Sequence, residues 1–427
     1  MELTKITFGD ETPTVGLLQE VLSKTGYYGG GITYAYDNAT ASALEDFQKA
    51  AGLVPDGIVG PLTWGALMPY ITGNYIYKVK SGDTLSTIAT RFRTELNSIK
   101  AANPLLNSDN IVPGEEITVP FISKIIPVNL KYSNEIMQLN INALKLRYPF
   151  IEIIDAGMSV LGKNIPVIRI GRGARKVFYN ASHHANEWIT TPLLMKFTDD
   201  FCYAFVNDQT IKGFNIRRIF DKTSIYIMPM VNPDGVDLVT GALPKDSEGY
   251  KYAVSISREN IPFPSGWKAN IRGVDLNLNY PARWEEAKKI KYAKGYSSPA
   301  PRDFVGPYPF SEPESRTVGQ FTKNINPDLT LSYHSQGEII YWKFLDYNPP
   351  ASLEIAQEFS RQSGYTVAET PYESGFAGYK DWFIQEYNLP GYTIEVGKGT
   401  SPLPLTQFDQ IYTDNIGILL YAADTQL

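Results

Sequence analysis

Histidine is scarce in this chain of 427 residues, and its placement points to metal chemistry. The sequence contains three histidines, of which His183 and His184 are adjacent and His334 stands alone. His184 and Glu187 are three residues apart, just after an apolar stretch ending at Tyr179, so one helical turn would put imidazole and carboxylate on the same side. His334 also directly follows an apolar stretch. Because two histidines, one carboxylate and an open position suit a catalytic zinc ion, we expect one zinc bound by His184, Glu187 and His334, with His183 outside the ligand set.

The opposing interpretation is structural. A lone histidine is more often a hydrogen-bonded core or surface group than a ligand, and the spacing His-x-x-Glu arises by chance in many chains. The metal hypothesis therefore depends on the elements that would bring these residues together.

Composition limits what those elements can be. The chain is 43% hydrophobic and 20% charged, which is typical of packed globular domains, and its length predicts several of them. Its net charge of -6 provides no basic surface for nucleic acid. The single cysteine, Cys202, excludes an internal disulfide framework. We see no apolar run long enough for membrane insertion and no secretion signal near Met1, so a cytoplasmic or forespore location, or a wall association reached by a non-classical route, is expected.

Residues 1–72 predict a small helical bundle. The apolar residues Val15, Leu18, Val21 and Leu22 share one helical face, and Leu44 with Phe47 indicates a second helix. The segment 52–64 has turn residues followed by Pro61 at a first helical position, which predicts a short third helix.

Residues 75–121 follow a different pattern. An alternating strand over 75–79 precedes a turn and helix cap at 81–84, and Leu85, Ile88, Ala89 and Phe92 have helical spacing. A second helix ends before Pro104, and residues 111–120 return as a strand. The predicted order is β-α-α-β.

Residues 128–427 alternate strands with helices, which predicts an α/β domain with a mixed, largely buried sheet. Functional residues should gather where its strands end. The expected strands are Pro166–Ile170, Lys176–Tyr179, Ser224–Met228, Leu329–Tyr333 and Tyr392–Glu395.

Two sets of short motifs link the first segments to cell walls. Asp56-Gly57 and Gly60-Pro61-Leu62-Thr63 resemble the helical peptidoglycan-binding domain. Ser81-Gly82-Asp83-Thr84-Leu85, Asn103-Pro104 and Val112-Pro113-Gly114-Glu115 resemble the LysM domain, which binds glycans containing N-acetylglucosamine. This resemblance implies glycan binding by Gly82, Asp83, Thr84, Leu85, Asn110 and Ile111. A bundle without a ligand and a degenerate LysM copy remain alternatives.

A series of motifs in the third segment resembles the zinc carboxypeptidase family. The series comprises Pro229–Gly235, Trp267-Lys268, Gly273–Asn277, His334-Ser335 and Ile394-Glu395. The resemblance implies that His184, Glu187 and His334 bind zinc and that Glu395 activates the attacking water. A salt-bridged Glu395 is the structural alternative, and Asp275 could be either a partner of a ligand or a turn residue.

The departures from the family pattern concern substrate binding. Lys268 stands where the family has the arginine that polarises the scissile carbonyl, so it keeps a positive donor without the bidentate fork. Asn277 matches the asparagine that contacts the substrate carboxylate, but Leu278 and Asn186 replace arginines. The resemblance implies a lid tyrosine at Tyr372 or, less well, at Tyr379.

With two wall-binding modules, the pattern looks most like the γ-D-glutamyl-diaminopimelate peptidases of this family, which cleave peptidoglycan stem peptides. This resemblance implies a sporulation or recycling setting. Arg272 and Arg302 are candidates to receive substrate carboxylates, although structurally paired arginines are the alternative. An ordinary zinc carboxypeptidase acting on α-linked peptides and a catalytically inactive wall-binding protein remain rival hypotheses. Glycan strands and stem peptides are the expected partners.

Overall fold

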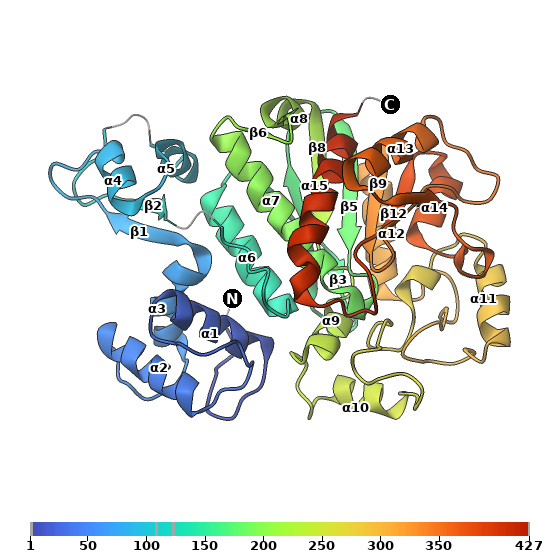
Figure 1. Ribbon diagram of the computed structural model, residues 1–427, viewed down its shortest axis with the longest axis horizontal. Coiled ribbons are helices and arrows are strands. Elements are labelled where there is room, and N and C mark those ends of the chain that lie inside the picture. The colour runs from blue at the N-terminus through green and yellow to red at the C-terminus, as the bar shows by residue number, and fades with distance from the viewer. Residues whose placement is uncertain (1–2, 107–109, 122–123, 426–427) are drawn as a thin grey trace. The chain divides into compact units, whose positions relative to one another are not determined.

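The computed structural model describes residues 3–106, 110–121 and 124–425. The chain divides into two compact units, Met1–Ile151 with Asp199–Gln209, and Glu152–Thr198 with Thr210–Leu427. Figure 1 labels their elements. The predicted order of a helical bundle, a β-α-α-β module and an α/β domain is confirmed.

The helical bundle at the start of the first unit has the three predicted helices. They are α1 (Pro13–Lys24), α2 (Asn38–Ala50) and α3 (Pro61–Thr72). Thr12 caps α1 by accepting a hydrogen bond from the backbone of Val15, and Pro61 occupies the first turn of α3. Leu18, Leu44 and Leu67 are fully buried between the helices, so their apolar faces form the core of the bundle.

The β-α-α-β module follows as β1 (Asn74–Lys78), α4 (Leu85–Phe92), α5 (Leu96–Ala102) and β2 (Glu116–Pro120). The two strands are antiparallel, with Asn74 opposite Pro120. The second strand is shorter than predicted, because the backbone N–H of Glu115 bonds back to Val112 and Gly114 has φ +95°. This turn ends only where β2 begins.

Helix α6 (Asn134–Arg147) completes the first unit. The buried guanidinium of Arg147 donates to the carbonyl of Gly73 at 2.8 Å and to Asn74 Oδ1 at 3.2 Å, at the junction between the bundle and the module. At the other end of α6, Glu135 accepts a hydrogen bond of 2.6 Å from Thr14. The bundle and the module are therefore anchored to α6 within this unit.

The second unit contains an eight-stranded mixed sheet in the order β11-β10-β12-β9-β5-β8-β4-β3. Its strands are β3 (Glu152–Met158), β4 (Asn164–Ile170), β5 (Arg175–Ala181), β8 (Thr223–Met228), β9 (Leu329–His334), β10 (Ile339–Tyr341), β11 (Thr366–Ala368) and β12 (Gly391–Glu395). Strands β8, β5, β9 and β12 run parallel. Because the carboxyl ends of parallel strands meet at one edge, residues that follow β5, β9 and β12 come together there.

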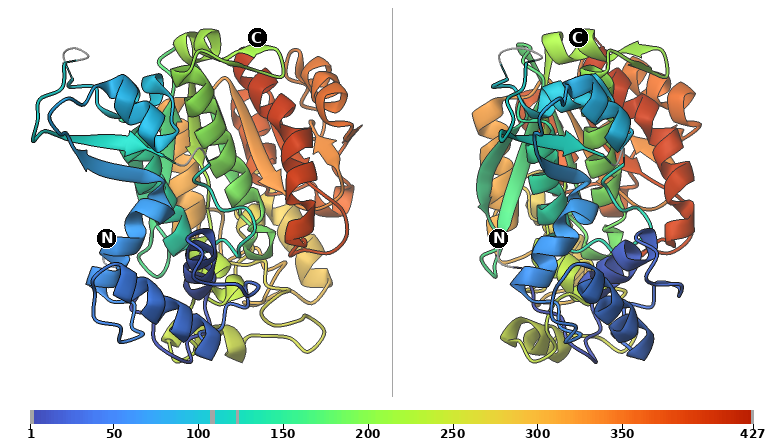
Figure 2. Two further views of the ribbon diagram at one scale, coloured as in Figure 1. Left: turned by 60° about the vertical axis from the view of Figure 1, so that its left-hand side comes forward. Right: turned by 90° about the vertical axis from the view of Figure 1, so that its left-hand side faces the viewer.

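Helices cover both faces of this sheet, as Figures 1 and 2 show. The helices that follow β5 in the chain are α7 (Thr190–Val206), α8 (Ile216–Lys222), α9 (Pro233–Thr240), α10 (Glu248–Ser255), α11 (Trp284–Ala293), α12 (Pro313–Ile325), α13 (Ser352–Ser363), α14 (Tyr379–Tyr387) and α15 (Phe408–Asp424), and a small hairpin is formed by β6 (Thr210–Ile211) and β7 (Phe214–Asn215).

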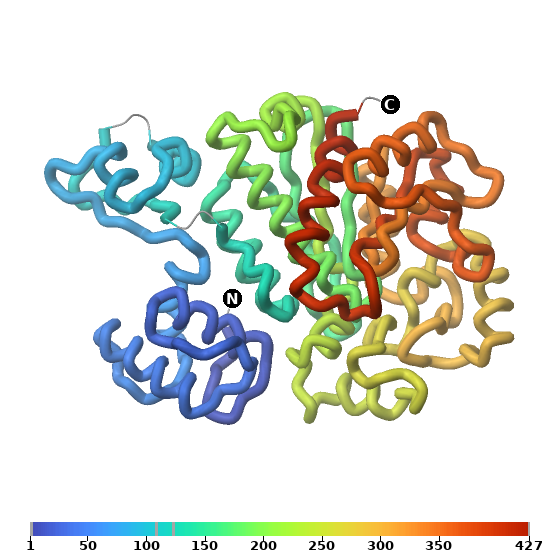
Figure 3. Tube along the Cα trace, in the orientation of Figure 1, coloured from blue at the N-terminus to red at the C-terminus, as the bar shows by residue number. Residues whose placement is uncertain are grey.

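Adjacent residues of β5 show how the two faces are filled. Phe178 packs against Phe321 of α12, with ring centroids 5.4 Å apart. Tyr179 points to the opposite face, where its hydroxyl donates to the carbonyl of Leu419 in α15 at 2.8 Å. Figure 3 traces the chain through β5, α12 and α15, which are distant in sequence and in contact in the fold. Alternation along a strand thus divides the core into two layers.

Across the described residues, no helix has the length and apolar character that crossing a membrane requires.

Candidate metal centre

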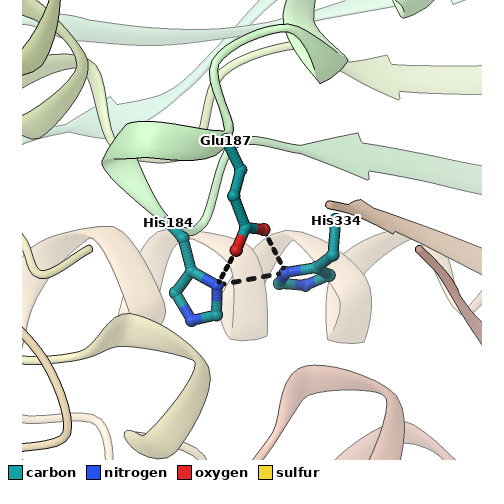
Figure 4. A group of neighbouring side chains, drawn as sticks. All are labelled: His184, Glu187 and His334. Carbon is teal, nitrogen blue, oxygen red and sulfur yellow. Dashed lines mark hydrogen bonds and ion pairs between the residues drawn. The ribbon is translucent and has the colours of Figure 1, made fainter. Parts of the chain in front are cut away.

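The three expected ligands meet at the edge of the sheet where the parallel strands end. His184 precedes the short helix η1 (Ala185–Glu187), which follows β5 and carries Glu187. His334 is the last residue of β9, which is the parallel neighbour of β5. Figure 4 shows the side chains of His184, Glu187 and His334 converging on a common point.

The distances between these side chains fit a small cation. His184 Nδ1 lies 3.0 Å from Glu187 Oε1, His334 Nδ1 lies 3.0 Å from Glu187 Oε2, and the two Nδ1 atoms are 3.3 Å apart. A tetrahedral zinc ion with bonds of about 2.0–2.1 Å has ligand atoms about 3.3 Å apart. The group could therefore hold a metal ion with little movement.

Neighbouring groups orient His184 and Glu187. Asp275 Oδ1 lies 2.9 Å from His184 Nε2, so the imidazole donates there and turns Nδ1 toward the other ligands. The backbone N–H of Ser335 donates to Glu187 Oε2 at 3.1 Å, and Lys268 Nζ donates to Glu187 Oε1 at 2.7 Å. The prediction that Asp275 could be the partner of a ligand agrees with this contact.

Charges in the site oppose the effect of burial. Burial alone would lower the pKa of His184, but the carboxylates of Glu187 and Asp275 raise it to about 9. Burial would raise the pKa of Glu187, but Lys268 and His184 hold it well below its usual range. Burial lowers the pKa of His334. Glu187 is therefore a ready anionic ligand and His334 a ready neutral one, whereas His184 must lose a proton before it can bind a metal.

Glu395 ends β12, and its backbone is paired with that of His334. Burial and the nearby charge of Glu187 raise its pKa to about 8. Lys268 opposes this effect but does not cancel it. A carboxylate of raised pKa beside a metal group is suited to taking and returning a proton.

A cavity of about 210 Å³ opens beside this group. Its walls include His184 and Glu395, the expected oxyanion-stabilising residue Lys268, and two residues expected to bind substrate, Asn277 and Arg302. They also include two cations that no sequence motif indicated, Lys291 and Lys380. Lysines on helices are too common in sequences to signal a site, so only their position in the fold makes them candidates.

Arg272 does not lie on this cavity. It lines a separate hollow with Tyr308, and its guanidinium lies 3.7 Å from Glu312. Its predicted role in binding the substrate is not supported, because the loop from Asn270 to Val274 turns its side chain toward Glu312. Arg302 lines the metal-side cavity and remains the better candidate.

The two tyrosines proposed as a lid differ sharply. Tyr379 is buried, and its hydroxyl lies 3.1 Å from that of Thr322 and 3.2 Å from that of Thr330, so it is part of the core. Tyr372 is 66% exposed on the short helix η3 (Tyr372–Ser374), close in sequence to Ser374 of the cavity wall. Only Tyr372 has the freedom that a lid requires.

His183 points away from the ligand group, as expected. Its Nε2 lies 2.9 Å from the hydroxyl of Tyr280, and its ring stacks on that of His334 at 5.7 Å. Burial holds its pKa well below the usual range, so the ring is neutral. It packs behind a ligand rather than acting as one.

The residues expected to bind glycan in the β-α-α-β module have mixed positions. The side chain of Leu85 is buried in the module core, and Thr84 caps α4. Asp83 is held by the hydroxyl of Tyr77 at 2.6 Å and by Arg91 at 2.9 Å. Gly82, with φ +85°, forms the turn, and Asn110 is exposed with Ile111 partly so. Leu85 can therefore contribute to a glycan site only indirectly, by packing in the core of the module.

Comparisons with known proteins match each of the three segments. The model of the family described as zinc carboxypeptidase matches residues 137–417, a peptidoglycan binding domain matches residues 11–67, and a LysM domain matches residues 77–120. The gamma-D-glutamyl-L-diamino acid endopeptidase 1 of Lysinibacillus sphaericus is 43% identical over 289 residues, which cover 68% of this chain and 71% of that protein. The uncharacterized protein YqgT of Bacillus subtilis is 35% identical over 347 residues, covering 81% and 86% of the two chains.

Solved structures show the same fold at low identity. Thrombin activatable fibrinolysis inhibitor has a TM-score of 0.54 and 19% identity, with 70% of this chain and 75% of that chain covered. Carboxypeptidase A from Helicoverpa armigera has a TM-score of 0.51 and 18% identity, with 91% and 96% covered.

Proposed function

The chain belongs to the zinc carboxypeptidase family, and we propose that this metallopeptidase hydrolyses peptidoglycan stem peptides at the γ-D-glutamyl-diaminopimelate bond. The observation that carries the chemistry is the placement of Glu395 beside the group formed by His184, Glu187 and His334. The bond is suggested by the relative whose name describes a gamma-D-glutamyl-L-diamino acid endopeptidase.

Zinc is the ion that these ligands would hold, one per chain. When bound, it would supply Lewis-acid chemistry by polarising the scissile carbonyl and lowering the pKa of water to about 7. His184 and His334 would bind it through Nδ1 and Glu187 through its carboxylate.

The residues around that group have separate tasks. Glu395 takes a proton from the attacking water and returns it to the leaving amine, for which its raised pKa is suited. Lys268 stabilises the negative charge that develops on the carbonyl oxygen, with Glu187 holding its ammonium at the cavity wall. Asp275 keeps His184 oriented.

Substrate selection depends on where the cavity offers charge. Leu278 lines the cavity beside Asn277, so that point lacks a bidentate cation for a terminal carboxylate. Asn277 can still donate a hydrogen bond through its amide, because its Oδ1 accepts from the backbone of Tyr379 at 3.0 Å. A substrate carboxylate must therefore be met elsewhere, and Arg302 is available on the wall. This arrangement favours a γ-linked glutamyl peptide over an ordinary C-terminal residue.

Competition between two substrates tests this function. The enzyme is incubated with L-Ala-γ-D-Glu-diaminopimelate and with an α-linked peptide ending in Phe or Leu, and products are identified by mass. We expect faster cleavage of the γ-linked peptide. Faster release of Phe or Leu would return the protein to the ordinary carboxypeptidases, and absence of both zinc and hydrolysis would leave only a wall-binding protein.

The bundle and the β-α-α-β module would hold the enzyme on the wall and raise the local concentration of stem peptides. The full chain is the right material for testing this, because Arg147 of α6 is hydrogen-bonded to the junction at Gly73 and Asn74. A full-length Glu395→Gln protein should co-sediment with purified sacculi without digesting them. Its recovery in the supernatant would contradict the proposed role.

A further inference from the structure

Two cations on the cavity wall share one carboxylate. Lys291 Nζ, from α11, lies 2.5 Å from Asp303 Oδ1, and Arg302 Nε lies 2.7 Å from Asp303 Oδ2. All three residues line the cavity beside His184. By themselves these three side chains carry a net charge of +1, and the carboxylate of Asp275, which also interacts with both cations, is shared with His184.

The cluster is partly withdrawn from water. The side chains of Lys291 and Asp303 are 12% and 15% exposed, whereas that of Arg302 is 41% exposed. Asp303 accepts from the Nε of Arg302, and Arg302 lines the cavity. An unbalanced cation that is partly desolvated attracts an anion more strongly than one in open solvent.

Hydrogen bonds tie the cluster to the metal centre. The backbone N–H of Asp303 donates to Asp275 Oδ2 at 3.2 Å, and Asp275 Oδ1 accepts from His184 Nε2 at 2.9 Å. The cations are thus held at a set position relative to a metal ligand. An anion bound to them would share the cavity with His184 and Glu395.

The other cations of the cavity have other partners or another task. Lys268 Nζ donates to Glu187 at 2.7 Å, and its ammonium is assigned above to the carbonyl oxygen of the scissile bond. Lys380 is buried, and its Nζ donates to the carbonyl of Lys343 at 2.7 Å and to Thr370 at 3.2 Å, with Asp381 2.5 Å away. Lys291 and Arg302 therefore carry the charge that substrate can use.

We propose that Lys291 and Arg302, held in place by Asp303, bind the α-carboxylate of the γ-linked D-glutamyl residue. This inference rests on the proposed function and names the group that is recognised. In a γ-linkage the α-carboxylate branches from the chain a few bonds from the scissile carbonyl, whereas an α-linked peptide has no such group. Lys291 becomes a specificity-determining residue of the site.

The experiment compares L-Ala-γ-D-Glu-diaminopimelate with the same peptide carrying an α-carboxamide on its D-glutamyl residue. A charge-assisted hydrogen bond is worth about 1.5–3 kcal/mol, so the wild-type enzyme should prefer the free carboxylate by about 10- to 100-fold in kcat/KM. Lys291→Gln should remove most of this preference by slowing cleavage of the carboxylate substrate alone. Lys291→Arg should restore it, and Lys289→Gln, an exposed lysine on the same helix, should leave it unchanged.

Each outcome separates the inference from the function on which it rests. If the wild type cleaves neither peptide, the proposed function fails. If it cleaves both equally, or if Lys291→Gln retains the preference with normal zinc content and melting temperature, carboxylate recognition by this cluster is wrong while the proposed function stands. A Lys291→Gln protein that slows both substrates equally would also overturn the inference, because that is the result of general damage.

Discussion

Replacing Asp275 with Asn should weaken zinc binding, and the deficit should become larger as the pH rises. Asp275 Oδ1 accepts a hydrogen bond of 2.9 Å from His184 Nε2, and both side chains are largely buried. Loss of a carboxylate that orients a metal-binding histidine typically costs about 10- to 100-fold in affinity. This corresponds to about 1.4–2.7 kcal/mol.

A second effect acts in the opposite direction. In the metal-free protein, the pKa of His184 is about 9, since the charges of Glu187 and Asp275 outweigh its burial. Protons compete with zinc below that pH, and the wild-type affinity should fall about tenfold for each unit. Asp275→Asn removes one of the two charges and so lowers this pKa, which relieves the competition. The full deficit should therefore appear near pH 9 and a smaller one near pH 7.

The assay is competition for zinc with a chromophoric chelator at about pH 7, 8 and 9. Asp246→Asn removes an exposed carboxylate of the same unit and serves as the control. A deficit that is constant across this range, or larger at pH 7, would refute the reasoning. Retention of wild-type affinity throughout would remove Asp275 from any role in orienting His184.

Three further changes test other parts of the site and the core. Glu395→Gln should keep zinc but lower turnover by about 10²–10⁴-fold, since it removes the proton carrier; near-normal turnover would exclude that role. His334→Ala should lose both bound zinc and activity, and full zinc occupancy by metal analysis would contradict its assignment. Glu314, whose pKa burial raises to about 7, is costly to ionise in place. That cost is absent below about pH 4.5 and complete above about pH 7. Glu314→Gln should therefore raise the melting temperature relative to wild type by more near pH 8 than near pH 5. An equal change at both pH values would show that ionisation is not the cause.

The local features of this protein could be predicted because they depend on near neighbours in the chain. The helix that begins at Pro61, the cap at Thr84 and a strand over Lys176–Tyr179, which in the structure extends to Ala181, follow from turn residues and apolar periodicity. Proximity of His184 to Glu187 follows from a single turn of helix. The arrival of His334 beside them follows from the rule that parallel strands end at one edge.

The remaining features depend on directions that only the packed chain defines. Arg272 and Arg302 both lie near the predicted site in sequence, but a loop turns Arg272 toward Glu312 while Arg302 faces the cavity. Lys291 and Asp303 meet through the packing of α11 against a loop, with no motif to indicate it.

By itself, the sequence determined the candidate metal-binding side chains, the order of the modules and the strands that carry the site. Each of these depends on residue type and short spacing, which are properties of a chain segment. The tertiary structure decided which cations line the cavity, which of Tyr372 and Tyr379 is exposed and which carboxylate is hydrogen-bonded to His184. Those outcomes are set by contacts between residues that are distant in sequence, and spacing along the chain does not specify where a side chain points.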